Sequence, residues 1–390
     1  MTEAEKKLDE YFLVAKKLAD ELTDHPEIGL ENPFSAGRAI DILLKEGYRI
    51  ERPFGGLDHA FRASLVHEKP VSNYRLALLM EYDALPDLGH ACGHSISGAI
   101  SLLSFLTYMH NRDDVNLSVD LIGCPGEEFP GGKILLAERG VFADYDLACM
   151  VHLGSANYAS TTALAIVDRL ISFQGKSAHA STNPQEGRNA LNAGRLFMTA
   201  MDMWRQHLPT TDQFHGVVVE GGELPSVVPE KTVLNYYLRS KNVEDLRCLS
   251  DKLTWSAEGA ALATDTQMEI NQQYPMYPDL SYNATWAKLI RQEMEELGME
   301  VEGDYCNFGS TDLGAVDQLI PSIQPMIDAT GDRNILLHST DFARAMKNEP
   351  AYMALKQGGM LLVQMLEKLN RFPDIIEEIV KEHRKKRNRM

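Results

Sequence analysis

Short apolar runs that alternate with helical patterns constrain the fold of this chain more than any other feature. Runs of strand length occur at 76–80, 117–124 and 147–153. Apolar residues recur with helical spacing at 1–24, 35–46, 100–110 and 133–139. Alternation of this kind predicts an α/β fold in which helices flank a mostly parallel sheet.

The pattern changes near residue 163. The segments that follow read as a strand, a helix, two strands, a helix and a strand, at 163–175, 188–206, 216–219, 232–239, 243–263 and 267–273. This order is typical of an α+β ferredoxin-like module. Pro275 and Pro278 mark a return linker, after which a helix at 284–297 resumes the earlier pattern. We therefore expect one domain made from 1–163 and 278–390, interrupted by an inserted domain at 164–277.

Composition excludes several classes of partner. The formal charge of −18 argues against nucleic acids and anionic membranes, which bind basic surfaces. No apolar stretch approaches the roughly 20 residues that span a bilayer, and residues 2–7 do not begin a signal sequence. We expect a cytoplasmic protein whose five scattered cysteines are reduced thiols.

Polar residues follow the three strand-length runs of the first domain. Asp83 follows the first run, Glu127 and Glu128 follow the second, and His152 closes the third. In open α/β sheets, functional groups gather at the carboxyl ends of the strands. These side chains are therefore candidates for a common site.

The densest cluster of chemically active residues is His90-Ala91-Cys92-Gly93-His94. If this segment is extended, Cys92 and His94 point to the same side, and a thiolate beside an imidazole suits zinc. A buried thiol next to a structural histidine explains this motif alone equally well.

Two neighbouring glutamates form the second candidate element. Glu127 and Glu128 lie in a turn rich in glycine and proline, where one carboxylate can bind a metal while the other reaches an activated water. His152 and His338 are each more simply explained as structural histidines. Together with the first cluster, however, the sequence offers enough ligands for two divalent ions if one ligand bridges: Cys92, His94, Glu128, His152 and His338.

Several separated motifs in this order resemble the aminoacylase and carboxypeptidase family of zinc metallopeptidases. They are Asp83-Ala84-Leu85-Pro86, His90 to His94, Glu127-Glu128, His152, Gly175 to Ala180, and His338-Ser339. The Cys-Gly-His form and Gly309-Ser310-Thr311-Asp312 are most similar to the branch that contains p-aminobenzoyl-glutamate hydrolases, amino-acid-conjugate hydrolases and certain dipeptidases.

The resemblance implies a catalytic, metal-binding α/β domain and an inserted lid that mediates a homodimer or larger homo-oligomer. It implies that Cys92 bridges two metal ions, that Glu127 is the general base and that Asp83 orients a ligand. His179, in the lid, would stabilise the oxyanion, often across the dimer. Arg239 is a candidate for binding a substrate carboxylate.

The chain departs from the family pattern at two positions. Members usually carry Asp or Asn after Cys-Gly-His, where this chain has Ser95. A lid asparagine that commonly touches substrate is replaced by Ser226. The surroundings of the ligands and the substrate preference are therefore both in question.

We expect a two-metal amidohydrolase that cleaves the amide bond of an N-acyl amino acid or short peptide. Thiolate ligation favours Zn²⁺, although Mn²⁺ or Co²⁺ also suits the remaining ligands. Two alternatives stay open. One is a cysteine hydrolase with Cys92 as nucleophile and His94 as base. The other is a non-catalytic metal-binding or regulatory protein on the same fold.

Overall fold

The computed structural model describes residues 2–65, 73–110, 116–307 and 309–387. Residues 1 and 388–390, which belong to the expected first domain, lie outside this description. The chain divides into two compact units, the main unit of Met1–Ala163 with Leu280–Met390 and the inserted unit of Leu164–Asp279. The sequence-based boundary lay at 277/278, two residues before the observed junction.

The main sheet of the described part of the main unit contains six strands in the order β1-β2-β4-β3-β5-β13. Their bounds are Arg49–Glu51, Phe61–Ser64, Leu117–Cys124, Tyr74–Glu81, Leu147–Cys149 and Ser322–Ile323. The pairings β3 with β4, β3 with β5, and β5 with β13 are parallel, whereas β1 and β2 pair antiparallel at one edge. The predicted α/β fold with a mostly parallel sheet is therefore confirmed.

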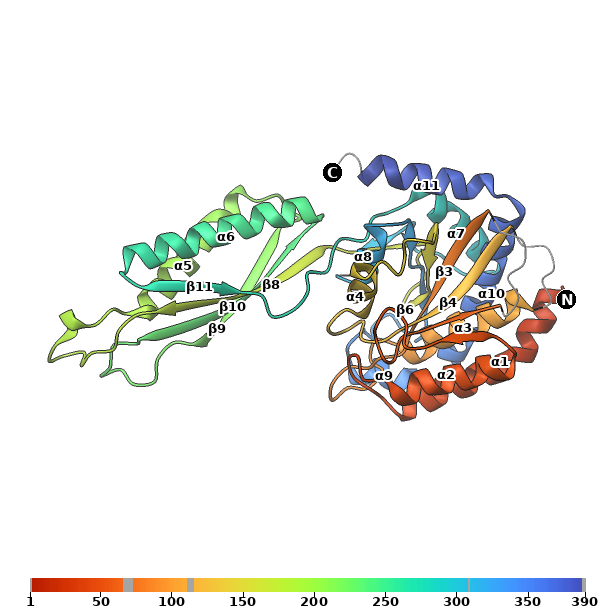
Figure 1. Ribbon diagram of the computed structural model, residues 1–390, viewed down its shortest axis with the longest axis horizontal. Helices are drawn as coiled ribbons and strands as arrows, with labels where there is room; N and C mark the ends of the chain where they lie inside the picture. Colours follow the sequence, from red (N-terminus) through yellow and green to blue (C-terminus); the bar gives the residue numbers. More distant parts are fainter. Residues whose placement is uncertain (1, 66–72, 111–115, 308, 388–390) are drawn as a thin grey trace. The chain divides into compact units, whose positions relative to one another are not determined.

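Both faces of this sheet are buried. Along β3, Leu76, Leu78 and Met80 join one apolar core while Ala77 and Leu79 join the other, as expected for alternating side chains. Helices α1, α3, α7, α10 and α11 pack on the larger core, at Glu3–Asp24, His94–Met109, Ala284–Glu296, Glu349–Arg371 and Asp374–Arg387. Helices α4 (Gly132–Glu138) and α8 (Leu313–Asp317) pack on the smaller core, and Figure 1 shows helices on both sides of β3 and β4.

Helix α3 is buried over its whole length, which brings its first residues close to the carboxyl end of β3. Gly98 permits this approach, because a Cβ there would lie 2.2 Å from the Glu81 carbonyl oxygen. Serines on the helix donate hydrogen bonds to neighbouring segments, from Ser97 to Val151 O and from Ser101 to Leu79 O. The helix expected from residue 100 thus begins at His94, because its buried positions leave no amphipathic pattern to mark its start.

The remaining elements of the main unit are short. The strand expected at 147–153 is two strands, β5 and β6 (His152–Gly154), and β6 pairs with β14 (Met326–Asp328). Strands β7 (Thr161–Thr162) and β12 (Cys306–Asn307) form another parallel pair. Helices α2 and α9 span Pro33–Lys45 and Thr340–Ala345. The segment between β5 and β6 lets His152 leave the main sheet and face the turn that carries Cys92.

The inserted unit is a four-stranded sheet in the order β11-β8-β10-β9. The strands are Gln267–Asn271, Ala165–Gln174, Lys231–Ser240 and Gln213–Glu220, all paired antiparallel. Helices α5 (Ala190–Trp204) and α6 (Val243–Ala263) cover one face through a core that includes Phe173, Phe197 and Leu249. Two short 3₁₀ turns occupy Pro184–Glu186 and Arg205–His207. This is the β-α-β-β-α-β order expected from the sequence.

Within the described residues, no helix combines the length and the apolar character that crossing a membrane requires.

Candidate metal centre and catalytic site

Cys92 and His94 are placed by the start of helix α3. Gly93 has φ +88° at the N-cap, a left-handed conformation that favours glycine, and His94 is the first helical residue. The expectation of an extended segment was therefore wrong. The two side chains converge through a tight turn instead, and both are buried.

Glu127 and Glu128 lie in a turn that follows strand β4. The amides of Gly131 and Gly132 donate to Gly126 O at 2.8 and 2.9 Å, which closes the loop ahead of helix α4. Both glutamates thus lie in a turn, as the glycine and proline residues around them predicted. Glu127 is only 5% exposed, whereas Glu128 is less deeply buried.

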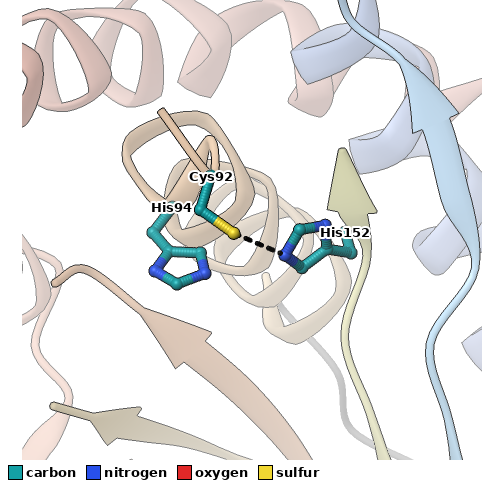
Figure 2. A group of neighbouring side chains, drawn as sticks. All are labelled: Cys92, His94 and His152. Carbon is teal, nitrogen blue, oxygen red and sulfur yellow. Dashed lines mark hydrogen bonds between the residues drawn. The ribbon is translucent and has the colours of Figure 1, made fainter. Parts of the chain in front are cut away.

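The structure brings the five predicted ligands together in two overlapping groups. Ligand atoms of Cys92, His94 and His152 lie within 4.8 Å of one another, and so do those of Cys92, Glu128 and His338. Figure 2 shows the sulfur of Cys92 directed at the ring of His152, with the Sγ to Nε2 distance at 3.5 Å. Cys92 is the member shared by both groups.

His338 reaches the site from a distant part of the sequence. Its backbone has φ +60°, and its amide donates to Ala91 O at 2.9 Å, beside the Cys92 turn. Its Nε2 lies 3.4 Å from Glu128 Oε1. The side chain is 53% exposed, so this edge of the site is open within the main unit.

Asp83 joins the two loops that carry the ligands. Its Oδ1 lies 3.1 Å from His94 Nδ1, and its Oδ2 accepts a hydrogen bond from the Glu128 amide at 3.0 Å. The His94 ring is thereby oriented with Nε2 toward the site. This is the geometry of a carboxylate that fixes a metal-binding histidine.

Buried polar atoms at this point fit a cation. Among the described residues, His94 Nε2 and Glu128 Oε1 are buried and form no well-aligned hydrogen bond, although Glu81 Oε2 lies 3.3 Å from the first and His338 Nε2 lies 3.4 Å from the second. Such groups are costly unless they are paired or coordinate a metal. One soft sulfur, three imidazoles and a carboxylate form a donor set that suits Zn²⁺ and neighbouring divalent ions.

Burial and neighbouring charges shift the pKa values of these groups in different directions. Burial and the charge of His94 lower the pKa of His152 to about 4. Burial acts to raise the pKa of Glu128, but the close contact with His338 and the charge of His94 outweigh it and lower the pKa to about 2. The same contact raises the pKa of His338 against a smaller effect of burial. Burial, with Glu128 nearby, raises the pKa of the Cys92 thiol well above its usual value.

Glu127 has the surroundings of a proton acceptor. Burial raises its pKa well above the usual value, and the nearby carboxylates of Asp312 and Glu81 add to the shift. Its Oε2 lies 3.9 Å from His94 Nε2, so it borders the candidate ligands. A carboxylate whose pKa is raised in this way is suited to general acid and base chemistry.

Three charged residues beside Glu127 were not among the residues expected at the site. Lys133 Nζ lies 2.6 Å from Glu81 Oε1 and forms an ion pair with Asp312, and all three side chains are fully buried. The sequence gave a partial indication, because Glu81 ends an apolar strand and Asp312 ends the motif Gly309-Ser310-Thr311-Asp312. Lys133 gave none, since a lysine in a helical pattern is usually solvated.

Ser95 is buried and its hydroxyl is hydrogen-bonded to Thr23 Oγ1 at 2.8 Å. The replacement of the usual Asp or Asn therefore leaves a satisfied neutral pair between α3 and α1. The replacement changes none of the five candidate ligands.

Of the three candidate residues of the inserted unit, His179 and Ser226 lie close together, and Arg239 lies apart from both. His179 is exposed, its Nδ1 accepts from the Ser181 and Thr182 amides at 3.3 and 3.2 Å, and it pairs with Val227 beside Ser226. Arg239 is opposite Ile166 at the other end of β8, whereas Lys231 is opposite Gln174. The strand from Lys231 to Arg239 alone spans roughly 27 Å.

Comparison with known proteins gives consistent results. Residues 165–261 match the family model described as the peptidase dimerisation domain. The chain is 31% identical to the Xaa-Arg dipeptidase of Mus musculus over 343 residues, 85% of this chain and 79% of that protein. It is 32% identical to one of the two p-aminobenzoyl-glutamate hydrolase chains of Escherichia coli (strain K12), over 65% of this chain and 56% of that protein.

A solved structure shows the same fold. A dinuclear metal binding peptidase of the M20 family from Bacillus subtilis superposes with a TM-score of 0.72 at 17% identity, over 92% of this chain and 99% of that chain. The shared fold and the similar proteins agree with the family that the sequence motifs resemble. The chain therefore belongs to the M20 family of metal-dependent peptidases and amidohydrolases.

Proposed function

We propose that the main unit holds two divalent cations and hydrolyses the amide bond of dipeptides or N-acyl amino acids. In this proposal Cys92, His94 and His152 bind one ion, and Cys92, Glu128 and His338 bind the other. The overlap of these two groups at Cys92 is the observation that carries the proposal. A shared ligand holds two ions a few ångströms apart, as catalytic two-metal sites require.

Bound cations would polarise the substrate carbonyl and lower the pKa of a water molecule. The protein's own residues do the rest. Glu127, whose pKa burial raises, accepts a proton from the attacking water and returns it to the leaving amine. Asp83 keeps His94 oriented throughout, because the distance between Asp83 Oδ1 and His94 Nδ1 is 3.1 Å.

The donor set favours some divalent metals over others. A thiolate favours Zn²⁺, whereas imidazole and carboxylate also accept Mn²⁺ or Co²⁺, so loading depends on availability. We propose Zn²⁺ as the first metal to test.

The state of Cys92 favours metal binding over covalent catalysis. A cysteine nucleophile needs a lowered pKa, yet burial raises the pKa of Cys92 well above its usual value. Metal binding deprotonates such a thiol outright. A non-catalytic role for the same fold is disfavoured by Glu127, which is buried beside the ligands with a raised pKa.

The inserted unit is proposed to form a homodimer through strand β9. This strand is an edge of its sheet, and Val217, Val218 and Val219 are 64%, 46% and 60% exposed. An exposed apolar edge strand is a template for pairing with another chain. The match of residues 165–261 to a peptidase dimerisation domain supports dimerisation through the inserted unit.

A dimer also explains the separation between His179 and Arg239. Both are proposed to contact substrate, His179 at the oxyanion and Arg239 at a carboxylate, with Ser226 beside His179. A dipeptide is far shorter than the roughly 27 Å of strand between them. The two residues can therefore serve one substrate only if they come from different protomers. We propose that His179 acts on the active site of the partner subunit.

The activity is tested by loading the purified protein with Zn²⁺, Mn²⁺ or Co²⁺ and measuring release of free amino acid. The panel contains dipeptides with Arg, Lys, Glu or Leu at the second position, N-acetyl amino acids and p-aminobenzoyl-glutamate. The proposal is supported if release depends on the metal and is abolished by chelation. Thiol alkylation of the loaded enzyme should leave the release intact. Absence of release from every compound with both metals bound would falsify it.

A further inference from the structure

A fully buried lysine lies directly behind the proposed general base. Lys133 is the second residue of helix α4, which begins where the Glu127 loop ends. Its Nζ lies 2.6 Å from Glu81 Oε1 and pairs with Asp312 Oδ1, and its amide donates to Asp312 Oδ2 at 2.8 Å. Lys133 thus joins the end of β3, the start of α4 and the segment before α8.

Glu127 belongs to the same cluster of charges. One carboxylate oxygen each of Glu81, Glu127 and Asp312 lies within 4.8 Å of the other two. Three buried carboxylates at this spacing repel one another strongly, because little water screens them. The ammonium of Lys133 already occupies the position of a cation among them, so we do not assign a third metal ion here.

The cluster also contacts the proposed metal ligands. Glu81 Oε2 lies 3.3 Å from His94 Nε2, while its other oxygen contacts Lys133. Glu127 borders the same imidazole, with its Oε2 3.9 Å from His94 Nε2, and one of its oxygens lies within 4.8 Å of oxygens of Glu81 and Asp312. The position of the Glu127 carboxylate therefore depends on the balance of the charges around it.

We propose that Lys133 is a positioning residue for catalysis, whose fixed positive charge restrains Glu81 and Asp312 and keeps the Glu127 carboxylate in place beside the metal centre. This role rests on the proposed function. It differs from a purely structural role, in which removing one partner of a buried ion pair would lower stability because the remaining charges are uncompensated. With a purely structural lysine, the folded and metal-loaded variant would keep the wild-type kcat.

The test compares Lys133→Met with the wild type, both loaded with Co²⁺. Methionine has a similar length and no charge, so unbalanced carboxylates displace Glu127 by about 1 Å, which costs roughly 100-fold in turnover. We expect kcat to fall by that factor, KM to change little, and both the bound metal and the cobalt absorption spectrum to match the wild type. Lys356→Met is the matched control, because Lys356 pairs with Asp9 on the surface.

A second variant distinguishes charge balance from packing. Lys133→Met combined with Asp312→Asn removes one carboxylate together with the ammonium, while the side-chain oxygen of the substituted asparagine can still accept the backbone amide of position 133. We expect it to recover at least about tenfold of the lost kcat. Wild-type kcat in Lys133→Met, loss of its metals or fold, or no recovery in the double variant each overturns the proposal.

A crystal structure of metal-loaded Lys133→Met supplies a readout that does not need substrate. The five ligands should coincide with those of the wild type while the Glu127 carboxylate moves. An unmoved Glu127 overturns the role of Lys133 whatever the activity. A wild type that is inactive on the whole panel instead counts against the proposed function, so the two failures are distinguishable.

Discussion

The Oδ1 of Asp83 lies 3.1 Å from Nδ1 of His94, and the same carboxylate accepts the amide of Glu128 through Oδ2. One side chain thereby sets both the orientation of an imidazole and the position of the loop that carries two glutamates. It connects the end of β3 to the start of α3 and to the turn after β4.

Replacing Asp83 by Asn should weaken metal binding. The amide has one acceptor oxygen, so it satisfies either His94 or the Glu128 amide but not both. Loss of such a partner typically costs about 10-fold to 100-fold in metal affinity. Competition with a chromophoric chelator measures the change. Asp87→Asn, at an exposed position with φ +61°, is the control, and equal affinities in both variants would show that Asp83 does not orient His94.

Glu127→Gln should abolish turnover while the protein keeps its metals. Glutamine preserves shape but cannot accept a proton, and general base catalysis contributes about 100-fold to 10,000-fold. Steady-state rates with elemental analysis of the same sample test this. Glu258→Gln, on the exposed side of α6, should behave as the wild type. A normal rate for Glu127→Gln assigns the base to another residue.

Mixed dimers test the proposal that His179 acts across subunits. Glu127→Gln and His179→Ala should each be nearly inactive, since loss of an oxyanion donor costs about 100-fold to 1000-fold. If His179 acts in trans, a mixed dimer contains one site with both native residues, so mixing the dissociated and reassociated variants restores activity. If it acts within its own chain, every site of the mixture lacks one residue and no activity returns.

Metal affinity should rise with pH. Burial raises the pKa of Cys92 well above its usual value, and the nearby Cys92, Glu81 and Asp83 outweigh burial and do the same for His94, so both groups hold protons near neutral pH that metal binding must release. The raised pKa of His338 acts in the same direction. Glu128 and His152, with pKa values of about 2 and 4, contribute no protons there. Calorimetric titration in buffers of different ionisation enthalpy should detect release of at least about one proton per chain. An affinity unchanged between about pH 6 and pH 8 contradicts this.

The sequence predicted the fold and the identity of the clustered residues better than it predicted local geometry. Apolar runs and helical periodicity located β3, β4 and the inserted unit, because burial is what those patterns record. The tight turn at Gly93 was missed, since a left-handed glycine leaves no periodic signal. The start of α3 was missed because all its faces are buried.

The charges behind Glu127 were hidden for a different reason. Lys133, Glu81 and Asp312 are far apart in sequence, and pairing across such distances depends on the tertiary fold. A lysine in a helix predicts solvent exposure, yet Lys133 is fully buried. The separation of His179 from Arg239 likewise required the register of β8 with β10.

The central claim is that Cys92 is shared between two bound cations, and metal stoichiometry tests it most directly. Metal-free protein is dialysed to equilibrium against Zn²⁺ and analysed for bound metal, in parallel with Cys92→Ala and with Cys248→Ala, which removes an exposed thiol. We predict two ions per chain for the wild type and for Cys248→Ala, with both weakened in Cys92→Ala. A wild type that binds fewer than two ions, or a Cys92→Ala variant that binds both with unchanged affinity, contradicts the account.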